Sequence, residues 1–303
     1  MLNYSRIAPI LSDIDRTVAS VERLTGGYSH EAWLVHCSSG ERVVVRFGEA
    51  DSGVEAAVLA LAGSVVPAPK VLASGDGFSV LRFVAGETLE AAFSREIDQD
   101  NLKALASELG QIVARIGTVE FDRPGFFGTD QLLPASEEAW SGQLPKFCAA
   151  QLAGSRRLTA AEADAWAELC QHNAEALVEI DPFRRLVHSD MNPKNIIVTQ
   201  IENVWRVAAI IDWEFAYSGC PFADAANMCR FPSEYPAGFL SAFTKSFELA
   251  APQLTDNWRH QARVLDMFAL SALAAKPDGH VIGDKAAIKI REWISNGIPP
   301  LGA

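Results

Sequence analysis

The sequence lacks any paired cysteine motif. Its 303 residues include five cysteines, an odd number, and no two of them form a C-x-x-C pair. This pattern excludes a disulfide framework and the usual zinc-site spacings. We therefore expect free thiols in a reducing cytoplasm, most of them small buried apolar side chains. The five are Cys37, Cys148, Cys170, Cys220 and Cys229.

A long hydrophobic run is also missing. No apolar stretch reaches the ~20 residues that cross a bilayer. The first residues do not show the charged and then apolar segments of a secretory signal peptide. We therefore expect a cytoplasmic protein with no membrane partner.

Positive charge is scarce. Lys and Arg number 26 against 38 Asp and Glu, which gives a formal net charge of −12. This balance argues against a nucleic-acid partner, which would need a basic patch. It would suit a cationic substrate attracted over a long range, although solubility alone explains an acidic surface equally well.

The most informative segment that is present reads His188-Ser-Asp-Met-Asn-Pro-Lys-Asn195, and Ile210-Ile-Asp-Trp-Glu214 follows it after an apolar run. The H-x-D-x-x-x-x-N spacing with a later Asp is that of the protein-kinase catalytic loop. Phosphoryl transfer to a hydroxyl needs a carboxylate that accepts the proton, and Asp190 suits this role. It also needs hard oxygen ligands for Mg²⁺, and Asn195 and Asp212 suit that one. The alternative is a β-hairpin whose polar turn carries these residues by chance.

The segment differs from a protein kinase in its details. D-F-G is replaced by Asp212-Trp-Glu, no A-P-E follows, and Gly219-Cys-Pro-Phe-Ala-Asp224 comes next. This combination resembles the aminoglycoside phosphotransferase and choline kinase superfamily, which pairs H-G-D-x-x-x-x-N with I-D-W-E and G-D-P-x-x-D. Ser189 and Cys220 depart from that pattern, at positions that do not carry the chemistry. The resemblance, which covers about residues 20 to 230, implies that Asp190 and His188 belong to the catalytic loop.

The N-terminal part fits the same resemblance. Gly26, Gly27 and Ser29 precede an apolar run, and the resemblance implies a turn over the ATP phosphates, where glycine lets the backbone approach closely. An ordinary hairpin turn is the alternative. Arg46, in the strand-like run 43–47, stands where kinases place the phosphate-binding Lys. Glu55, the only carboxylate of a predicted helix that ends at Gly63, would pair with it. Solvated side chains are the alternative for both.

A hinge segment follows. Ser79-Val-Leu-Arg-Phe-Val-Ala-Gly86 resembles the strand-to-linker segment whose backbone pairs with adenine, and Arg82, Phe83 and Val84 are the matching positions. Backbone recognition leaves the side chains free to vary, so position alone identifies this segment.

The resemblance implies an α+β, bilobal, protein-kinase-like fold. We expect a nucleotide-binding lobe at residues 1–84, with an antiparallel sheet and one helix, and a mostly helical catalytic and substrate-binding lobe at 85–303. Apolar periodicity predicts helices over 102–116, 239–249 and 258–275, and a last one that ends near Trp293. A further helix should bury Trp166, Leu169, Cys170, Leu177 and Val178, and Trp140, Trp258 and Trp293 should lie in the core.

Together these features predict an ATP-dependent small-molecule O-phosphotransferase, with GTP as an alternative donor and Mg²⁺ as its metal. The acceptor would be a hydroxyl of an antibiotic such as an aminoglycoside or macrolide. A metabolite kinase of the homoserine, choline or sugar-amine type, and a nucleotide-binding pseudokinase, stay open. Region 121–185 has a mild excess of acids, which permits a cationic substrate but equally fits a solvated helix face. These acids include Glu137, Glu138, Glu162, Asp164 and Glu168.

Overall fold

The computed structural model describes residues 2–24, 31–48, 52–135 and 138–302. Its chain forms two compact units, each built from three segments. The first unit comprises Met1–Ile97, Phe127–Leu133 and Pro193–Ala216. The second comprises Asp98–Phe126, Pro134–Asn192 and Tyr217–Ala303. Each unit is described by itself below.

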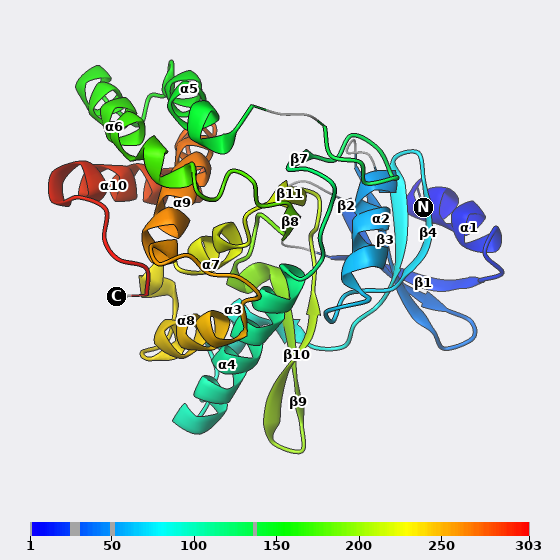
Figure 1. Ribbon diagram of the computed structural model, residues 1–303. Helices are drawn as coiled ribbons and strands as arrows, with labels where there is room; N and C mark the ends of the chain where they lie inside the picture. Colours follow the sequence, from blue (N-terminus) through cyan, green and yellow to red (C-terminus); the bar gives the residue numbers. More distant parts are fainter. Residues whose placement is uncertain (1, 25–30, 49–51, 136–137, 303) are drawn as a thin grey trace. The chain divides into compact units, whose positions relative to one another are not determined.

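An antiparallel five-stranded sheet forms the centre of the first unit, with the spatial order β1-β2-β3-β5-β4 (Figure 1). The strands are β1 (Val18–Leu24), β2 (Glu31–Cys37), β3 (Arg42–Phe47), β4 (Val71–Gly75) and β5 (Phe78–Arg82). Valine and aromatic residues dominate β2 and β3, as expected for strands whose branched side chains pack on a pleated surface.

Each face of this sheet is covered by a helix. α1 (Leu2–Ser12) packs Ile7 into the same apolar cluster as Phe47 of β3. Because side chains alternate along a strand, Arg46 points to the opposite face. On that face α2 (Ser52–Ala62) packs against β4 and β5. The strand therefore directs Arg46 toward α2 and away from α1.

A smaller sheet, with the order β10-β9-β6, completes the first unit. It consists of β6 (Glu87–Thr88), β9 (Ile196–Ile201) and β10 (Val204–Ile210), with the short helices α3 (Leu89–Ala92) and η2 (Pro193–Asn195) beside it. β9 and β10 form an antiparallel hairpin that pairs Ile196 with Ile210. The residues just before β9 and just after β10 are therefore neighbours.

The second unit is mostly helical (Figure 1). Gly110 of α4 (Gln99–Ile116) lets this helix approach α8 (Phe239–Ala250) closely, because a Cβ there would collide with the backbone of Phe243 and Phe247. The elements are α4 (Gln99–Ile116), α5 (Trp140–Leu152), α6 (Ala160–Asn173), η1 (Ala174–Leu177), α7 (Phe222–Met228), η3 (Pro232–Glu234), α8 (Phe239–Ala250), α9 (Trp258–Ala274) and α10 (Val281–Asn296).

A short sheet, ordered β7-β11-β8, lies within this helical unit. Its strands are β7 (Gly125–Phe126), β8 (Arg185–Val187) and β11 (Tyr217–Gly219). β8 ends directly before His188, and Tyr217 of β11 pairs with Val187. The sheet thus fixes the start of the H-x-D segment.

Most predicted elements are confirmed. Helices lie where periodicity placed them, and Trp140, Trp258 and Trp293 are buried. All five cysteines are buried free thiols. Among the described residues, no helix combines the length and apolarity needed to span a bilayer.

One burial prediction is wrong. Val178 is 58% exposed, because α6 ends at Asn173 and the chain continues as the 3₁₀ turn η1. A 3₁₀ turn has three residues per turn instead of 3.6, so it rotates the following side chains off the face that α6 buries. The helix α5 was not predicted, since Pro145 lies inside it and interrupts the helical signal.

Candidate active site

Arg46 joins two predicted site residues in the first unit. Its Nη1 donates to Oε1 of Glu55 at 2.5 Å, and its Nη2 donates to Oδ1 of Asp212 at 2.8 Å. Glu55 lies in the first turn of α2, facing β3. The predicted pairing of Arg46 with Glu55 is present, and the bond to Asp212 is an addition that sequence reasoning missed.

Arg46 and Glu55 are largely shielded from water, whereas the Asp212 side chain is 31% exposed. The side chain of Arg46 is 13% exposed and that of Glu55 is 6% exposed, which rules out the solvated alternative for both. Burial alone would lower the pKa of Arg46, but the negative charges of Glu55 and Asp212 outweigh it and raise the pKa. The guanidinium is therefore a fixed positive charge, held at a set position by two carboxylates.

Asn195 and Asp212 are brought together by the β9–β10 hairpin. Asn195 ends η2 just before β9, and the N–H of Ile211 donates to the Asn195 carbonyl at 2.9 Å. Asp212 adopts a positive φ of 69°, an uncommon conformation that often marks functional positions. One carboxylate and one amide oxygen from neighbouring backbone segments match the sparse protein ligation that Mg²⁺ accepts when phosphates supply further ligands. Within the described residues, no group of three or more His, Cys, Asp or Glu could hold a metal alone.

The H-x-D part of the loop belongs to the second unit. His188 is fully buried, and its Nδ1 accepts a hydrogen bond from the Asp190 N–H at 3.2 Å. Asn192 donates from Nδ2 to Oδ1 of Asp190 at 3.1 Å and to its carbonyl at 3.0 Å. Asp190 itself is half-buried. The buried His188 side chain therefore fixes the backbone of the loop at Asp190. Asn192 orients the Asp190 carboxylate, and sequence reasoning did not select this residue.

Asp224 clamps the start of this loop. Its Oδ2 accepts from the His188 N–H at 2.9 Å, and its Oδ1 accepts from the Ser189 N–H at 2.8 Å. Burial raises the pKa of Asp224, while His188 and the two N–H donors act in the opposite direction. Ser189 has a φ of 73°. That conformation favours glycine, which explains why the resembling family most often has Gly there.

Two of the three predicted hinge residues already donate their backbone N–H groups to neighbouring strands or segments of the sheet. The N–H of Arg82 donates to Lys70 and that of Phe83 donates to Arg42. The guanidinium of Arg42 also stacks over the Phe83 ring, 4.2 Å from its centroid. A purine edge at this segment would therefore have to use the Val84 amide or the backbone carbonyls. The predicted phosphate turn, Gly26, Gly27 and Ser29, lies outside the described residues.

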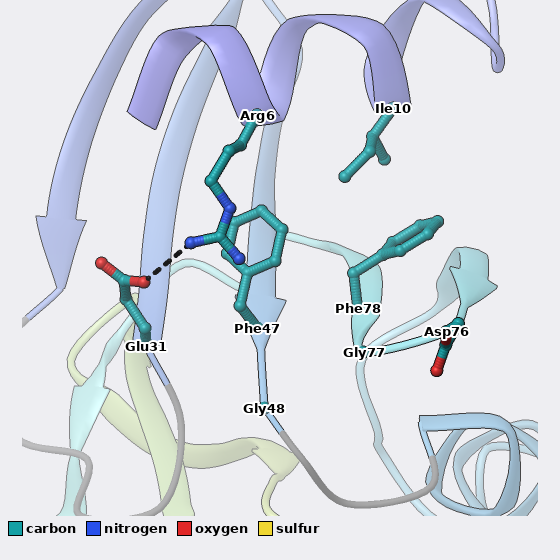
Figure 2. A pocket seen from close by; sticks show the side chains of 8 residues that line it. All are labelled: Arg6, Ile10, Glu31, Phe47, Gly48, Asp76, Gly77 and Phe78. Atoms are coloured by element: carbon teal, nitrogen blue, oxygen red, sulfur yellow. Dashed lines mark hydrogen bonds and ion pairs between the residues drawn. The ribbon is translucent and has the colours of Figure 1, made fainter. Parts of the chain in front are cut away.

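The first unit also has a hollow of about 560 Å³ on the α1 side of its sheet (Figure 2). Arg6 of α1 lies over the Phe47 ring at 4.0 Å and reaches Glu31 at 3.5 Å. Phe47 and Arg46 are consecutive residues of β3, so their side chains point to opposite faces of the sheet. The hollow is therefore on the other face from Arg46, Glu55 and Asp212.

Two of the acidic residues in region 121–185 that could attract a cationic substrate already form ion pairs within the chain. Glu138 pairs with Lys146 at 2.7 Å. Glu162 completes a capping box with Thr159 and binds Arg291 at 2.6 Å. Asp164 and Glu168 are exposed on α6, and Glu137 lies outside the described residues. The acid excess of this region is therefore partly structural.

The model of the phosphotransferase enzyme family matches residues 20–259. The chain belongs to this family. The predicted enzyme class, a phosphotransferase that acts on an alcohol group, is confirmed by this membership. No curated protein matches the chain.

Solved structures show the same fold at low sequence identity. Aminoglycoside phosphotransferase APH(4)-Ia is 17% identical, with a TM-score of 0.72 over 98% of this chain and 100% of that one. A thermostable mutant of that enzyme, in a ternary complex with ADP and hygromycin B, has a TM-score of 0.70 at 17% identity over 96% and 98% of the two chains. Macrolide 2'-phosphotransferase MphH from Brachybacterium faecium has a TM-score of 0.64 at 15% identity over 94% and 98%. The predicted α+β, kinase-like fold is confirmed.

Proposed function

We propose that this phosphotransferase is an ATP-dependent kinase that phosphorylates a hydroxyl of a small molecule, in the first instance an antibiotic such as an aminoglycoside or macrolide. The observation that carries the proposal is Arg46, a buried guanidinium held between Glu55 and Asp212. A fixed cation beside a candidate metal carboxylate suits the phosphates of a nucleotide. GTP is an alternative donor, since Arg46, Glu55 and Asp212 would face the phosphates and do not distinguish adenine from guanine.

The proton-accepting role falls to Asp190. Its carboxylate would take the proton of the acceptor hydroxyl while that oxygen forms a bond to the γ-phosphorus, and the bond from this phosphorus to the leaving ADP oxygen breaks. Asn192 supports this role by orienting the carboxylate, and His188 and Asp224 support it by shaping the loop. Positioning of this kind lowers the barrier without further covalent chemistry.

Asn195 and Asp212 are the proposed Mg²⁺ ligands, and their oxygen chemistry fits that metal. When bound, Mg²⁺ neutralises charge on the nucleotide phosphates. Arg46, Gly26, Gly27 and Ser29 would hold the phosphates from the protein side. The segment Arg82–Val84 would meet the purine through its backbone.

The acceptor need not be a polycation. Glu138 and Glu162 are paired with basic residues of the chain itself, which weakens the argument from acid excess for an aminoglycoside. This observation favours a macrolide over an aminoglycoside, and a metabolite hydroxyl is the second candidate. We further propose a cytoplasmic location, which the five unpaired buried thiols support.

A coupled ADP-release screen tests the proposal. Purified protein with MgATP or MgGTP is offered aminoglycosides, macrolides and small alcohols. We expect acceptor-dependent ADP release, and phosphorylation of the acceptor confirmed by mass. Asp190→Ala should lower turnover by roughly two to four powers of ten and leave nucleotide binding in place. Near-full turnover of this variant, or nucleotide binding with no turnover on any acceptor, would contradict the proposed chemistry.

A further inference from the structure

A pocket of about 410 Å³ lies in the second unit, where α9 and α10 meet the C-terminal segment. Its size falls within the range of small-ligand sites. Its walls are apolar rings together with two basic side chains, one carboxylate (Glu292) and one amide (Asn296). The residues that matter for its chemistry are Pro232, Arg263, Lys289, Trp293, Pro299 and Pro300.

Arg263 is a buried cation with incomplete partners. Only 5% of the residue is exposed. Its Nη1 donates to the Cys229 carbonyl at 3.1 Å, its guanidinium lies 5.7 Å from the centroid of the Trp293 ring, and its Nε has no acceptor. The indole Nε1 of Trp293 is also buried without an acceptor. Two buried donors that line one pocket therefore lack acceptors, which native structures generally avoid.

The charges around Arg263 do not balance. Asp266 is the carboxylate that attracts it, and the same Oδ1 of Asp266 accepts from Nε and Nη2 of Arg230 at 2.9 and 2.7 Å. Arg230 and Arg263 are both buried, so one carboxylate serves two guanidinium groups, and its Oδ2 has no donor. Lys289, at the same pocket, is paired with Glu292 at 2.9 Å. The buried part of the cluster thus carries one excess positive charge, which an anion would compensate.

The pocket is separate from the catalytic loop. Asp224, near the N-terminal end of α7, binds the loop, and Cys229, directly after α7, binds Arg263. The five residues from Asp224 to Cys229 rise about 7.5 Å along the helix axis. A ligand at Arg263 therefore lies roughly that far along α7 from the loop.

We propose that this pocket binds a small organic carboxylate. The Arg263 Nε and Trp293 Nε1 atoms are buried, so both side chains would turn toward the pocket for the carboxylate oxygens to accept from them. The apolar body of the ligand would pack against the prolines. A bare phosphate ion would satisfy the charge but leave the apolar walls uncovered, so the organic acid is favoured.

Calorimetric titration at constant ionic strength tests this, with benzoate and inorganic phosphate as the probes. We expect benzoate to bind wild type, and to bind Trp293→Phe about threefold to tenfold more weakly, because Phe keeps the ring and loses the donor. Arg263→Lys should weaken binding about tenfold or more, because Lys keeps the charge and loses the planar fork. Arg156→Gln is the matched control, since Arg156 is an exposed arginine of the same unit, paired with Asp278, and its affinity should equal that of wild type.

Three outcomes would overturn the proposal. They are the absence of benzoate binding to folded wild type, an unchanged affinity in Trp293→Phe, and tighter binding of phosphate than of benzoate. If Arg263→Lys does not fold, Trp293→Phe decides the question. The measurement needs no turnover, so its result is independent of the proposed kinase chemistry.

Discussion

At the scale of single residues, Arg46 makes contacts that a lysine could not reproduce. Its planar fork donates to Glu55 and to Asp212 from two different nitrogens. An ammonium group keeps the charge but cannot hold both carboxylates in this geometry. We expect Arg46→Lys to lower kcat/KM by about tenfold and Arg46→Ala by about a hundredfold or more.

The same substitutions should affect stability. Arg46→Ala leaves the Glu55 carboxylate buried and unpaired, at a cost of about 3 kcal/mol in the free energy of unfolding. Arg23→Lys, a matched change at an exposed arginine of β1 in the same sheet, should alter neither quantity appreciably. In denaturant titrations, Arg46→Ala combined with Glu55→Ala should cost less than the sum of the two single changes. Strict additivity would show that the two side chains do not act as a unit.

Ser189 is a residue in a glycine conformation. At its φ of 73° a Cβ is strained, so Ser189→Gly should raise the free energy of unfolding by ~0.5–1 kcal/mol. Ser241→Gly, in the exposed first turn of α8, should lower it by ~0.5–1 kcal/mol, because glycine adds flexibility to the unfolded chain and loses the hydroxyl that donates to the Gly238 carbonyl. Urea unfolding compares the two variants. A loss of stability in both would mean that position 189 is not strained.

At the scale of elements, α7 holds the proposed catalytic loop through one side chain. The two oxygens of Asp224 accept from two successive N–H groups of the loop. An asparagine offers one oxygen, and its amide nitrogen would face the second donor. Asp224→Asn should therefore cost about 2–3 kcal/mol of stability, with turnover per folded molecule less affected than in Asp190→Ala. Denaturant titration and active-fraction kinetics separate the two effects, and an unchanged unfolding midpoint would disprove the clamp.

The contact between α6 and α10 should give stability a pH dependence. The hydrogen bond from Arg291, together with the Thr159 cap, lowers the pKa of Glu162 to about 2. A depressed pKa means that this carboxylate stabilises the folded state above its unfolded pKa of ~4.3. The contribution is lost as pH falls from there toward 2.

Glu162→Gln tests this dependence, because Gln retains the capping geometry and loses the charge. Its Tm should lie below that of wild type by a constant amount between pH 5 and 7, and the gap should narrow below pH ~4.5. A gap that keeps its size down to pH 3 would assign the effect to packing. Lys289→Gln, which breaks another ion pair of α10, that with Glu292, serves as the control.

At the scale of the whole molecule, sequence order predicted much of the architecture, and it selected most residues of the candidate site, whose roles stay predictions. The H-x-D segment, Asn195 and Asp212 were readable because their spacing is short and chemically constrained. Arg46 and Glu55 are nine residues apart on consecutive elements, so their pairing also followed from order.

Other features could not be predicted because they depend on distant packing. Arg46 meets Asp212 across 166 residues of sequence, and no local pattern encodes that contact. Asn192 orients Asp190 only once the loop has its folded shape. The cluster of Arg230, Arg263 and Asp266 had one local signal, a lone carboxylate within the apolar stretch of α9, and its meaning becomes clear only when α7 lies against that helix.

The segmented first unit has a consequence for synthesis on the ribosome. Its main sheet is encoded before Ile97, but its last segment ends at Ala216. Elongation at roughly 5–20 residues per second leaves the nascent sheet waiting about 6–24 s for the strand pair that carries Asn195 and Asp212. During that interval Arg46 has Glu55 as a partner but not Asp212. In a nascent chain arrested near residue 190, we expect the β1–β5 sheet to resist proteolysis. Arg46 in that chain would still lack Asp212, its second carboxylate partner.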